Sequence, residues 1–291
     1  VAWHYAVQMT RPLWGHKSDQ SARRSPWIVG GLGVLALGAI LAVDATIMMA
    51  HAGIGAYLLA LLSFTMIGLG VGISGTALLA LLASRVAVER KPAAAAISWT
   101  MMVAGIVVAA GLSGAYLDPF SEPRLAIVAS LVALIAFCLA MLALRGVEDN
   151  NPIVHRPQSG HQSQDFVIVL KDIWRDREAR RFTYFVFISM LAYSMQDLIM
   201  EPFAGFLFAM TPGQSTQLSS LQHGGIVAGM LVAGAGGSLY ARQFGQNLKL
   251  WIVLGCLGSA LMLAGLSLAA GSGANWPLKA NVFGLGVANG I

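Results

Sequence analysis

The sequence has very little charge. Only 11% of its 291 residues are Asp, Glu, Lys or Arg, whereas 57% are hydrophobic, and the mean hydropathy is +0.70. A water-soluble domain of this size could not cover so much apolar surface with polar side chains. The composition therefore excludes a soluble globular protein and predicts an all-α integral membrane protein.

Cysteine and histidine are also scarce, with two and six residues. Cys138 and Cys256 both lie in apolar runs, which indicates neither a disulfide framework nor a metal cluster. The net charge of +5 does not indicate nucleic-acid binding, because the basic residues lie in short connections between apolar runs. No loop carries an aspartate-rich motif for a metal-bound diphosphate, and no nucleophile and base are paired, so we expect no enzyme.

Seven apolar runs are long enough to cross a bilayer as helices, which takes roughly 20 residues. Ser25 and Pro26 precede the first of them as a predicted N-cap and first helical residue. Partial helices at Val1–Pro12 and Lys279–Ile291 flank the seven, so we expect this chain to be an internal part of a longer protein. The predicted spans are Trp27–Met49, Tyr57–Ala83, Ala93–Leu117, Leu125–Leu144, Phe182–Met210, Leu218–Tyr240 and Leu248–Ala270.

Basic residues alternate between the connections. Lys and Arg occur in the first, third, fifth and seventh connections, whereas "HAGIG", "DPFSEP", "TPGQST" and "GSGANWP" contain none. Because Lys and Arg concentrate on the cytoplasmic side of a membrane protein, the connections with basic residues are predicted to be cytoplasmic. We expect the N-terminus and the central loop of the protein on that side as well.

The only long polar stretch covers residues 146–181. It predicts a cytoplasmic linker between an N-terminal helical half, residues 1–145, and a C-terminal half, residues 182–291. Within the linker, apolar residues recur at helical spacing from Phe166 to Trp174, with Asp165 as a candidate N-cap. This pattern is typical of an amphipathic helix on the membrane surface, serving as a connector or as a docking element for a partner.

Many of the 33 glycines lie inside the predicted spans. Gly68 and Gly72, and also Gly225 and Gly229, have the four-residue spacing that lets helix backbones approach closely. We therefore expect close helix packing at both pairs.

The first connection carries an ordered set of small and charged residues. The order is Gly-x-x-x-Asp-x-x-x-Arg-Arg, formed by Gly15, Asp19, Arg23 and Arg24. It resembles the signature loop between the second and third helices of the major facilitator superfamily, although Gln20 and Ala22 depart from the usual pattern. The resemblance implies a charge relay of Asp19 with Arg23 or Arg24 at a cytoplasmic gate. It also implies a fold of six plus six helices, of which this chain covers about helix 2 to part of helix 10.

Three longer blocks carry a more specific resemblance. They are "RPLWGHKSD" (11–19), "ISWTMMVAGIVVAAGLSGAYLDP" (97–119) and "QDLIMEPFAGFLFAMTPGQSTQLSSLQHGG" (196–225). These blocks look like the PucC family, a branch of the superfamily in phototrophic bacteria, and the resemblance covers essentially the whole chain. It implies a factor for assembling light-harvesting antenna complexes, which binds or delivers bacteriochlorophyll to antenna polypeptides.

The same resemblance implies the inner, intracytoplasmic photosynthetic membrane as the location. Antenna polypeptides and bacteriochlorophyll would be partners beside the lipid bilayer, and a homo-oligomer is left open. The alternative function is a proton-coupled secondary transporter of a small solute, because both functions share one fold.

One predicted span contains an unusual polar cluster, "SMQDLIMEPF", with Gln196, Asp197 and Glu201. A charge at the bilayer centre costs a few kcal/mol or more, so such residues are expected to line a cavity. Asp197 and Glu201 share a helical face, and at least one of them is expected to be protonated or paired. Pro202 is predicted to kink the helix beside them.

Gln222 and His223 lie about five residues inside the next predicted span. We expect His223 to reach the depth of the two carboxylates on the preceding, antiparallel helix. Three interpretations are open: a structural polar cluster, a proton-coupled transport site, and an axial ligand to the magnesium of bacteriochlorophyll. In the third, Gly224 and Gly225 would leave room for the flat macrocycle.

Overall fold

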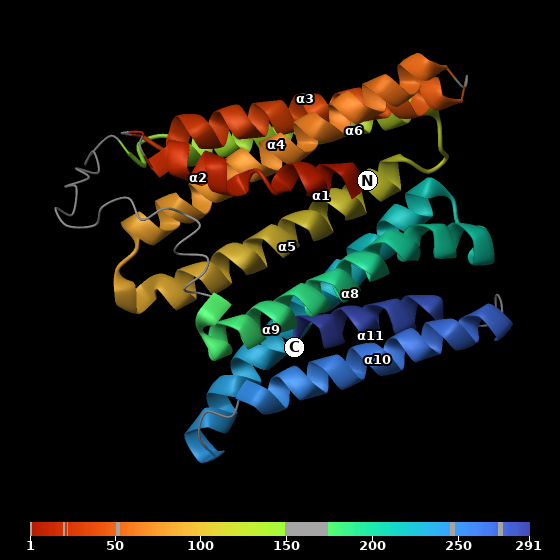
Figure 1. Ribbon diagram of the computed structural model, residues 1–291. Helices are drawn as coiled ribbons and strands as arrows, with labels where there is room; N and C mark the ends of the chain where they lie inside the picture. The colour runs from red at the N-terminus through yellow and green to blue at the C-terminus, as the bar shows by residue number, and fades with distance from the viewer. Residues whose placement is uncertain are drawn as a thin grey trace. The chain divides into compact units, whose positions relative to one another are not determined.

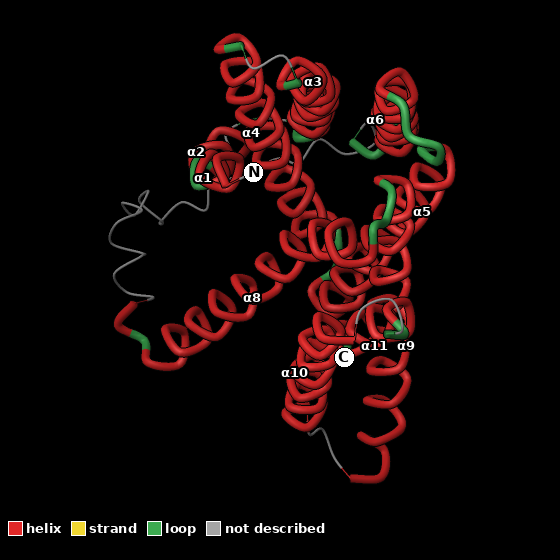
Figure 2. The backbone as a smooth tube through the Cα atoms, turned by 90° about the vertical axis from the view of Figure 1, so that its right-hand side faces the viewer, coloured by secondary structure: helices red, strands yellow, loops and turns green. Residues whose placement is uncertain are grey.

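The computed structural model describes residues 2–19, 21, 23–50, 53–148, 174–244, 248–272 and 276–291. Over these residues the secondary structure is entirely helical (Figures 1 and 2). Seven of the helices are long and apolar enough to cross a membrane, as predicted. The elements are α1 (Ala2–Gln8), α2 (Arg11–Asp19), α3 (Ser25–Met49), α4 (Ile54–Arg85), η1 (Val88–Arg90), α5 (Lys91–Tyr116), α6 (Glu122–Leu144), α8 (Arg177–Phe208), α9 (Pro212–Phe244), α10 (Leu248–Ser272) and α11 (Leu278–Gly290).

Helix α9 begins six residues before its predicted start at Leu218. The Thr211 backbone N–H donates to Gln214 Oε1 at 3.2 Å, and the Gln214 N–H donates to Thr211 Oγ1 at 3.3 Å. This reciprocal pair is a capping box, and Pro212 occupies the first turn, where its missing N–H costs nothing. The first turns are polar, so hydropathy alone placed the start too late.

The chain forms two compact units. The smaller one, from residue 154 to 209, contains α8. In the larger one, α4 packs along α3 and also contacts α1 and α2, and α6 packs on α3. Helix α9 packs between α5 on one side and α11 on the other, and α10 packs on α11 (Figure 1). Helix α9 therefore brings together segments from before and after the polar linker.

Glycines set the spacing of these helices. A Cβ on Gly68 of α4 would lie 2.7 Å from the His4 carbonyl oxygen of α1. On α9, a Cβ on Gly225 would lie 3.0 Å from Gly286 Cα, and one on Gly229 would lie 2.9 Å from Gly290 Cα. Distances this short leave no space for a methyl group. Close packing is thus confirmed at Gly68, Gly225 and Gly229, whereas Gly72 has only ordinary contact, with Arg11 Cγ at 3.5 Å.

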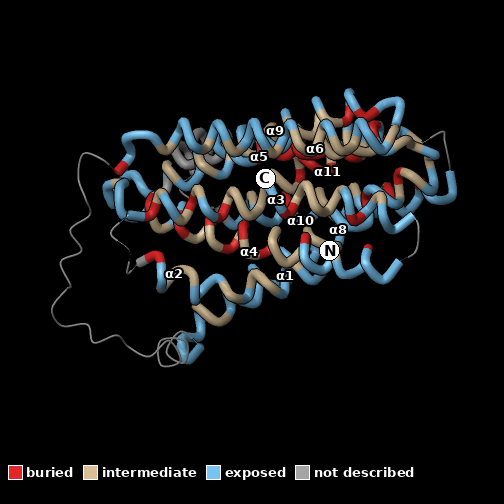
Figure 3. The backbone as a smooth tube through the Cα atoms, turned by 90° about the horizontal axis from the view of Figure 1, so that it is seen from above, coloured by how far each residue is buried: buried red, intermediate tan, exposed pale blue. Residues whose placement is uncertain are grey.

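Most apolar side chains point outward. Buried positions occur as short stretches along the helices, separated by exposed ones (Figure 3). The most apolar window of α6 has no buried residue, although its mean hydropathy is 2.9. A helix that is apolar on every face and exposed on most of them suits a lipid solvent rather than water.

We expect a one-carbon addition at two adjacent glycines of α9 to change stability in opposite directions. Gly225→Ala puts a methyl group against the Phe283 carbonyl and Gly286 of α11, so it should lower the free energy of unfolding by about 1–3 kcal/mol. Gly224→Ala meets no described heavy atom within 4 Å and should raise it by up to about 1 kcal/mol through helix propensity. Thermal unfolding in detergent measures both, and equal effects would contradict the packing of α9 on α11.

Candidate functional site

The polar pair Gln222 and His223 lies in the interior of α9. Their side chains are 2% and 8% exposed. His223 lies 11 residues (223 − 212) after the first residue of the helix, which is roughly 16 Å along the axis. The pair thus lies further from the helix start than the predicted five residues, because the capped polar turns precede it.

The His223 ring is oriented by its own helix. Its Nδ1 lies 2.8 Å from the backbone carbonyl oxygen of Ser219. A carbonyl oxygen only accepts hydrogen bonds, so Nδ1 is the donor, and the tautomer with this proton has its lone pair on Nε2. A backbone carbonyl holding one ring nitrogen is the arrangement that commonly orients a metal-ligating histidine.

Two helices fix the position of this part of α9. On the α5 side, Ser220 Oγ donates to the Val107 carbonyl oxygen at 2.8 Å. A Cβ on Gly114 of α5 would lie 2.8 Å from the Gln217 backbone nitrogen. On the α11 side, the Gln222 carbonyl oxygen contacts Gly286.

The two glycines beside His223 have different surroundings. Gly225 faces the backbone of α11, so the interpretation that it leaves room for a macrocycle is wrong. A side chain on Gly224, in contrast, would meet no described atom within 4 Å. Any flat ligand beside His223 would therefore have to lie on the Gly224 side.

A polar cavity of about 540 Å³ lies at the start of α9. The connection after α5, the first turns of α9 and the start of α11 line it, and one lining residue, Leu221, is the sequence neighbour of Gln222. Asp118 and Lys279 give it one charge of each sign. Its lining consists of Asp118, Met210, Gln214, Gln217, Leu218, Leu221 and Lys279.

The predicted carboxylates lie in α8, in the other unit. Asp197 and Glu201 are exposed on one face of this helix, one turn apart. Pro202 lies inside the helix, so the Leu198 carbonyl loses its backbone donor. A joint site of Gln196, Asp197 and Glu201 with the α9 pair stays a prediction.

A second polar cluster joins three segments on the predicted cytoplasmic side. The Glu148 carboxylate accepts hydrogen bonds from the backbone N–H groups of Arg24, at 2.9 and 3.1 Å, and of Ser25, at 2.9 Å. The Arg24 guanidinium donates to Ser84 Oγ at 3.0 Å and to the Ala80 carbonyl of α4. Arg24 and Glu148 are 7% and 6% exposed. The cluster therefore ties the start of α3 to the last turns of α4 and to the segment after α6.

Glu148 takes the place of the predicted side-chain cap. Ser25 was expected to be the N-cap of α3, but the N-cap is Arg24, whose side chain makes no capping hydrogen bond. The carboxylate that satisfies these N–H groups comes from a residue 124 positions away. In the sequence, the only indication of this cap was the charge of Glu148 beside the end of a predicted helix.

The pKa of Glu148 reports this environment. Burial by itself would raise the pKa, but the hydrogen bonds from the Arg24 and Ser25 backbones and the positive charge of Arg85 outweigh it. The pKa therefore lies below its usual value of 4.5. A negative charge at a helix N-terminus is also favoured by the helix dipole.

The other residues of the signature loop lie in α2 and in the turn after it. Gly15 of α2 lies against α4, where a Cβ would be 3.2 Å from Thr76 Cγ2. Asp19 ends α2, and Arg23 lies in the exposed turn, its carbonyl accepting from Ser21 Oγ at 2.9 Å. The charge relay of Asp19 with an arginine stays a prediction. The amphipathic helix expected around residues 165–173 lies outside the described residues.

These helices define a multi-pass helical membrane protein with a buried glutamine and histidine in one of its spans. A family model described as "PUCC protein" matches residues 1–291. The chain belongs to the PucC family, which confirms the resemblance in the sequence.

Curated relatives come from purple bacteria. The chain is 42% identical over 291 residues to the "Bacteriochlorophyll synthase 44.5 kDa chain" of Rhodobacter capsulatus, covering all of this chain and 66% of that protein. It is 30% identical over 223 residues to an "Uncharacterized protein in puhA-bchM intergenic region" of Rhodobacter capsulatus, covering 72% and 46%. It is 28% identical over 241 residues to "Protein PucC" of Cereibacter sphaeroides, covering 77% and 51%. The chain thus spans between about half and two thirds of the length of these relatives.

Replacing the capping carboxylate gives a pH-dependent prediction. Glu148→Gln should lower the free energy of unfolding by about 1 kcal/mol at pH 7, a typical value for a lost helix cap. Because the folded-state pKa lies below the usual value, this stabilisation is present above the usual pKa and is lost as pH falls through the folded-state pKa. The melting-temperature difference between wild type and variant, measured from pH 7 to pH 3, should shrink on acidification. A difference independent of pH would contradict the assignment.

Proposed function

We propose that the protein is an assembly factor for light-harvesting antenna complexes, binding bacteriochlorophyll at His223 and delivering it to antenna polypeptides in the membrane. Family membership and the relative named as a bacteriochlorophyll synthase chain support the pigment class. The observation that carries the proposal is the buried His223 ring, whose Nδ1 is held by the Ser219 carbonyl. The proposed role is binding and transfer, without catalysis.

The residues around His223 fit one coordination bond to a tetrapyrrole magnesium. Within the described part of the chain, no group of three or more His, Cys, Asp or Glu side chains could hold a metal ion. A metal already held by a macrocycle needs only an axial ligand, and one imidazole nitrogen can serve. Nε2 offers that lone pair, and Gly224 leaves one side of the helix open. Bound there, the pigment would supply the light-absorbing macrocycle, and the chain would hold it in a water-poor site.

The helix packing supports the six-plus-six arrangement as part of this proposal. Helix α5, from before the linker, packs along α9, from after it. Both helices contribute glycines and polar side chains to the contact, including Gly111 with Ser220. In the proposed fold, this contact joins the two helical halves next to the pigment site.

The test is the pigment content of the full-length protein, purified in mild detergent from a phototrophic host. We expect about one bacteriochlorophyll per chain, and His223→Phe should reduce this at least about five-fold, because it removes the axial nitrogen while keeping an aromatic ring in a buried position. The matched control is His4→Phe, which changes a histidine of α1 that packs beside Tyr5 and Phe64 and should keep the pigment. Thermal unfolding of both variants checks that the fold is intact.

Two outcomes would overturn the pigment proposal. One is a colourless, well-folded wild-type protein, and the other is an unchanged pigment content and absorption spectrum in His223→Phe. A shifted absorption band with unchanged pigment content would still support His223 as the ligand, because the ligand alters the electronic environment of the macrocycle.

The alternative, a proton-coupled transporter, is favoured by the carboxylates of α8 next to Pro202. It predicts proton uptake by vesicles containing the protein, abolished in Asp197→Asn or Glu201→Gln. The assembly function predicts no proton flux in any of the three proteins. A pH-sensitive dye inside the vesicles separates the two functions.

A further inference from the structure

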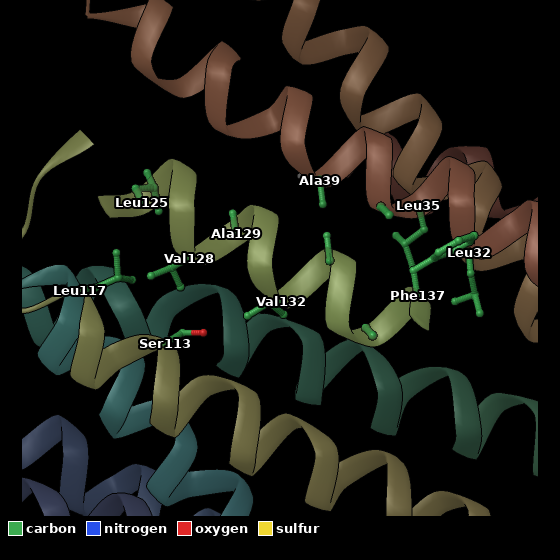
Figure 4. A pocket seen from close by; sticks show the side chains of 13 residues that line it. Leu32, Leu35, Ala39, Ser113, Leu117, Leu125, Val128, Ala129, Val132 and Phe137 are labelled. Carbon is green, nitrogen blue, oxygen red and sulfur yellow. The ribbon is translucent and has the colours of Figure 1, made fainter. Parts of the chain in front are cut away.

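An apolar groove of about 370 Å³ runs between α3, α5 and α6, apart from the His223 site. Ser113 is the single polar residue in its lining, which otherwise consists of Leu, Ala, Val and Phe side chains. The groove follows α6 from Leu125 to Phe137 (Figure 4). The 12 helical rises between these two residues correspond to roughly 18 Å, close to half of a hydrocarbon core of about 30 Å. The groove is therefore as long as one leaflet is thick.

Phe137 lies at one end of the groove. Phe137 reaches across to α3, where its Cε2 lies 3.6 Å from the Cβ position of Gly33. Between the ends, the α6 side of the groove is formed mainly by Ala129, Val132, Ala133 and Ala136. Small side chains in a row leave a channel suited to a single thin hydrocarbon chain.

The other end of the groove is polar. A second cavity of about 270 Å³ adjoins it and shares Val128 with it. Arg124, Asp118 and Tyr116 line this cavity. Tyr116 is 71% exposed, and exposed tyrosines at the ends of spans typically lie at headgroup level. The groove thus matches the arrangement of a lipid molecule, because an apolar channel suited to an acyl chain adjoins a charged mouth suited to a headgroup.

The charged side chains of Arg124 and Asp118 indicate which lipid headgroup would fit this polar end of the groove. Arg124 binds the Pro119 carbonyl through one guanidinium nitrogen, at 3.0 Å, and the other donors of its planar group match a phosphate. Asp118, which also lines the polar cavity with Lys279, would repel an anionic headgroup and attract an ammonium group. A zwitterionic phospholipid with a primary amine complements both.

We propose that this groove binds one phosphatidylethanolamine molecule, with an acyl chain between α3, α5 and α6, the phosphate on Arg124 and the ammonium on Asp118. The lipid fills the space between α6 and the rest of the larger unit. It therefore stabilises the packing of α6, which has few contacts with α5.

The test uses delipidated full-length protein titrated with dioleoyl-phosphatidylethanolamine, -phosphatidylglycerol and -phosphatidylcholine and followed by native mass spectrometry. We expect one tightly bound phosphatidylethanolamine, preferred on the order of five-fold over the other two lipids. Asp118→Asn should abolish the preference for phosphatidylethanolamine. Arg124→Gln should weaken the binding of all three lipids on the order of five-fold. Both side chains are exposed, so neither substitution should unfold the protein.

A filling substitution tests the acyl channel. Ala133→Phe places a ring in the groove and should lower lipid binding about ten-fold, whereas the matched control Leu131→Phe changes an exposed position of α6 outside the groove and should leave binding unchanged. Equal binding by Ala133→Phe and wild type would overturn the proposal. So would a preference for phosphatidylglycerol, or the absence of tight binding in the full-length protein, which would mean that another segment occupies the groove.

Discussion

The contact of α9 with α5 and α11 is the constraint on which the candidate site depends. Both neighbours approach so closely that a Cβ on Gly114 or on Gly286 would overlap backbone atoms of α9. Without a hydrophobic driving force between helices in lipid, such contacts depend on van der Waals packing and on hydrogen bonds across the interface. Ser220 provides one of these hydrogen bonds, to the Val107 carbonyl. The polar residues of α9 are therefore held within a tightly packed, buried region.

The buried histidine of α9 has a hydrogen-bond partner within the helix itself. A buried polar group without a partner costs a few kcal/mol. The His223 ring meets the cost within its own helix, by donating from Nδ1 to Ser219. That hydrogen bond needs no other helix, because both of its partners belong to α9.

Much of the fold was predictable from local pattern, whereas the site was less so. The seven spans could be predicted because the length and hydropathy of an apolar run depend only on consecutive residues. The spacing of Gly225 and Gly229 gave a correct helix interface, although the sequence could not name α11 as the partner. The start of α9 was predicted six residues too late because its capping turns are polar. For the same reason, the distance of His223 from the start of the helix was underestimated.

The cap of α3 shows the limit of a local analysis. Ser25 and Pro26 form a plausible helix start by themselves, and nothing nearby predicts a carboxylate from residue 148. That carboxylate becomes the better cap because it carries a full charge and can accept from two N–H groups at once. The buried Arg24 guanidinium in turn takes the end of α4 as its partner, so each charge lies at the helix end whose dipole favours it. Since Glu148 lies in the first residues of the polar linker, the start of the linker is held by the same interaction that caps α3. A substitution of Glu148 would therefore act on α3 through the hydrogen bonds of its first N–H groups, and on α4 through Arg24.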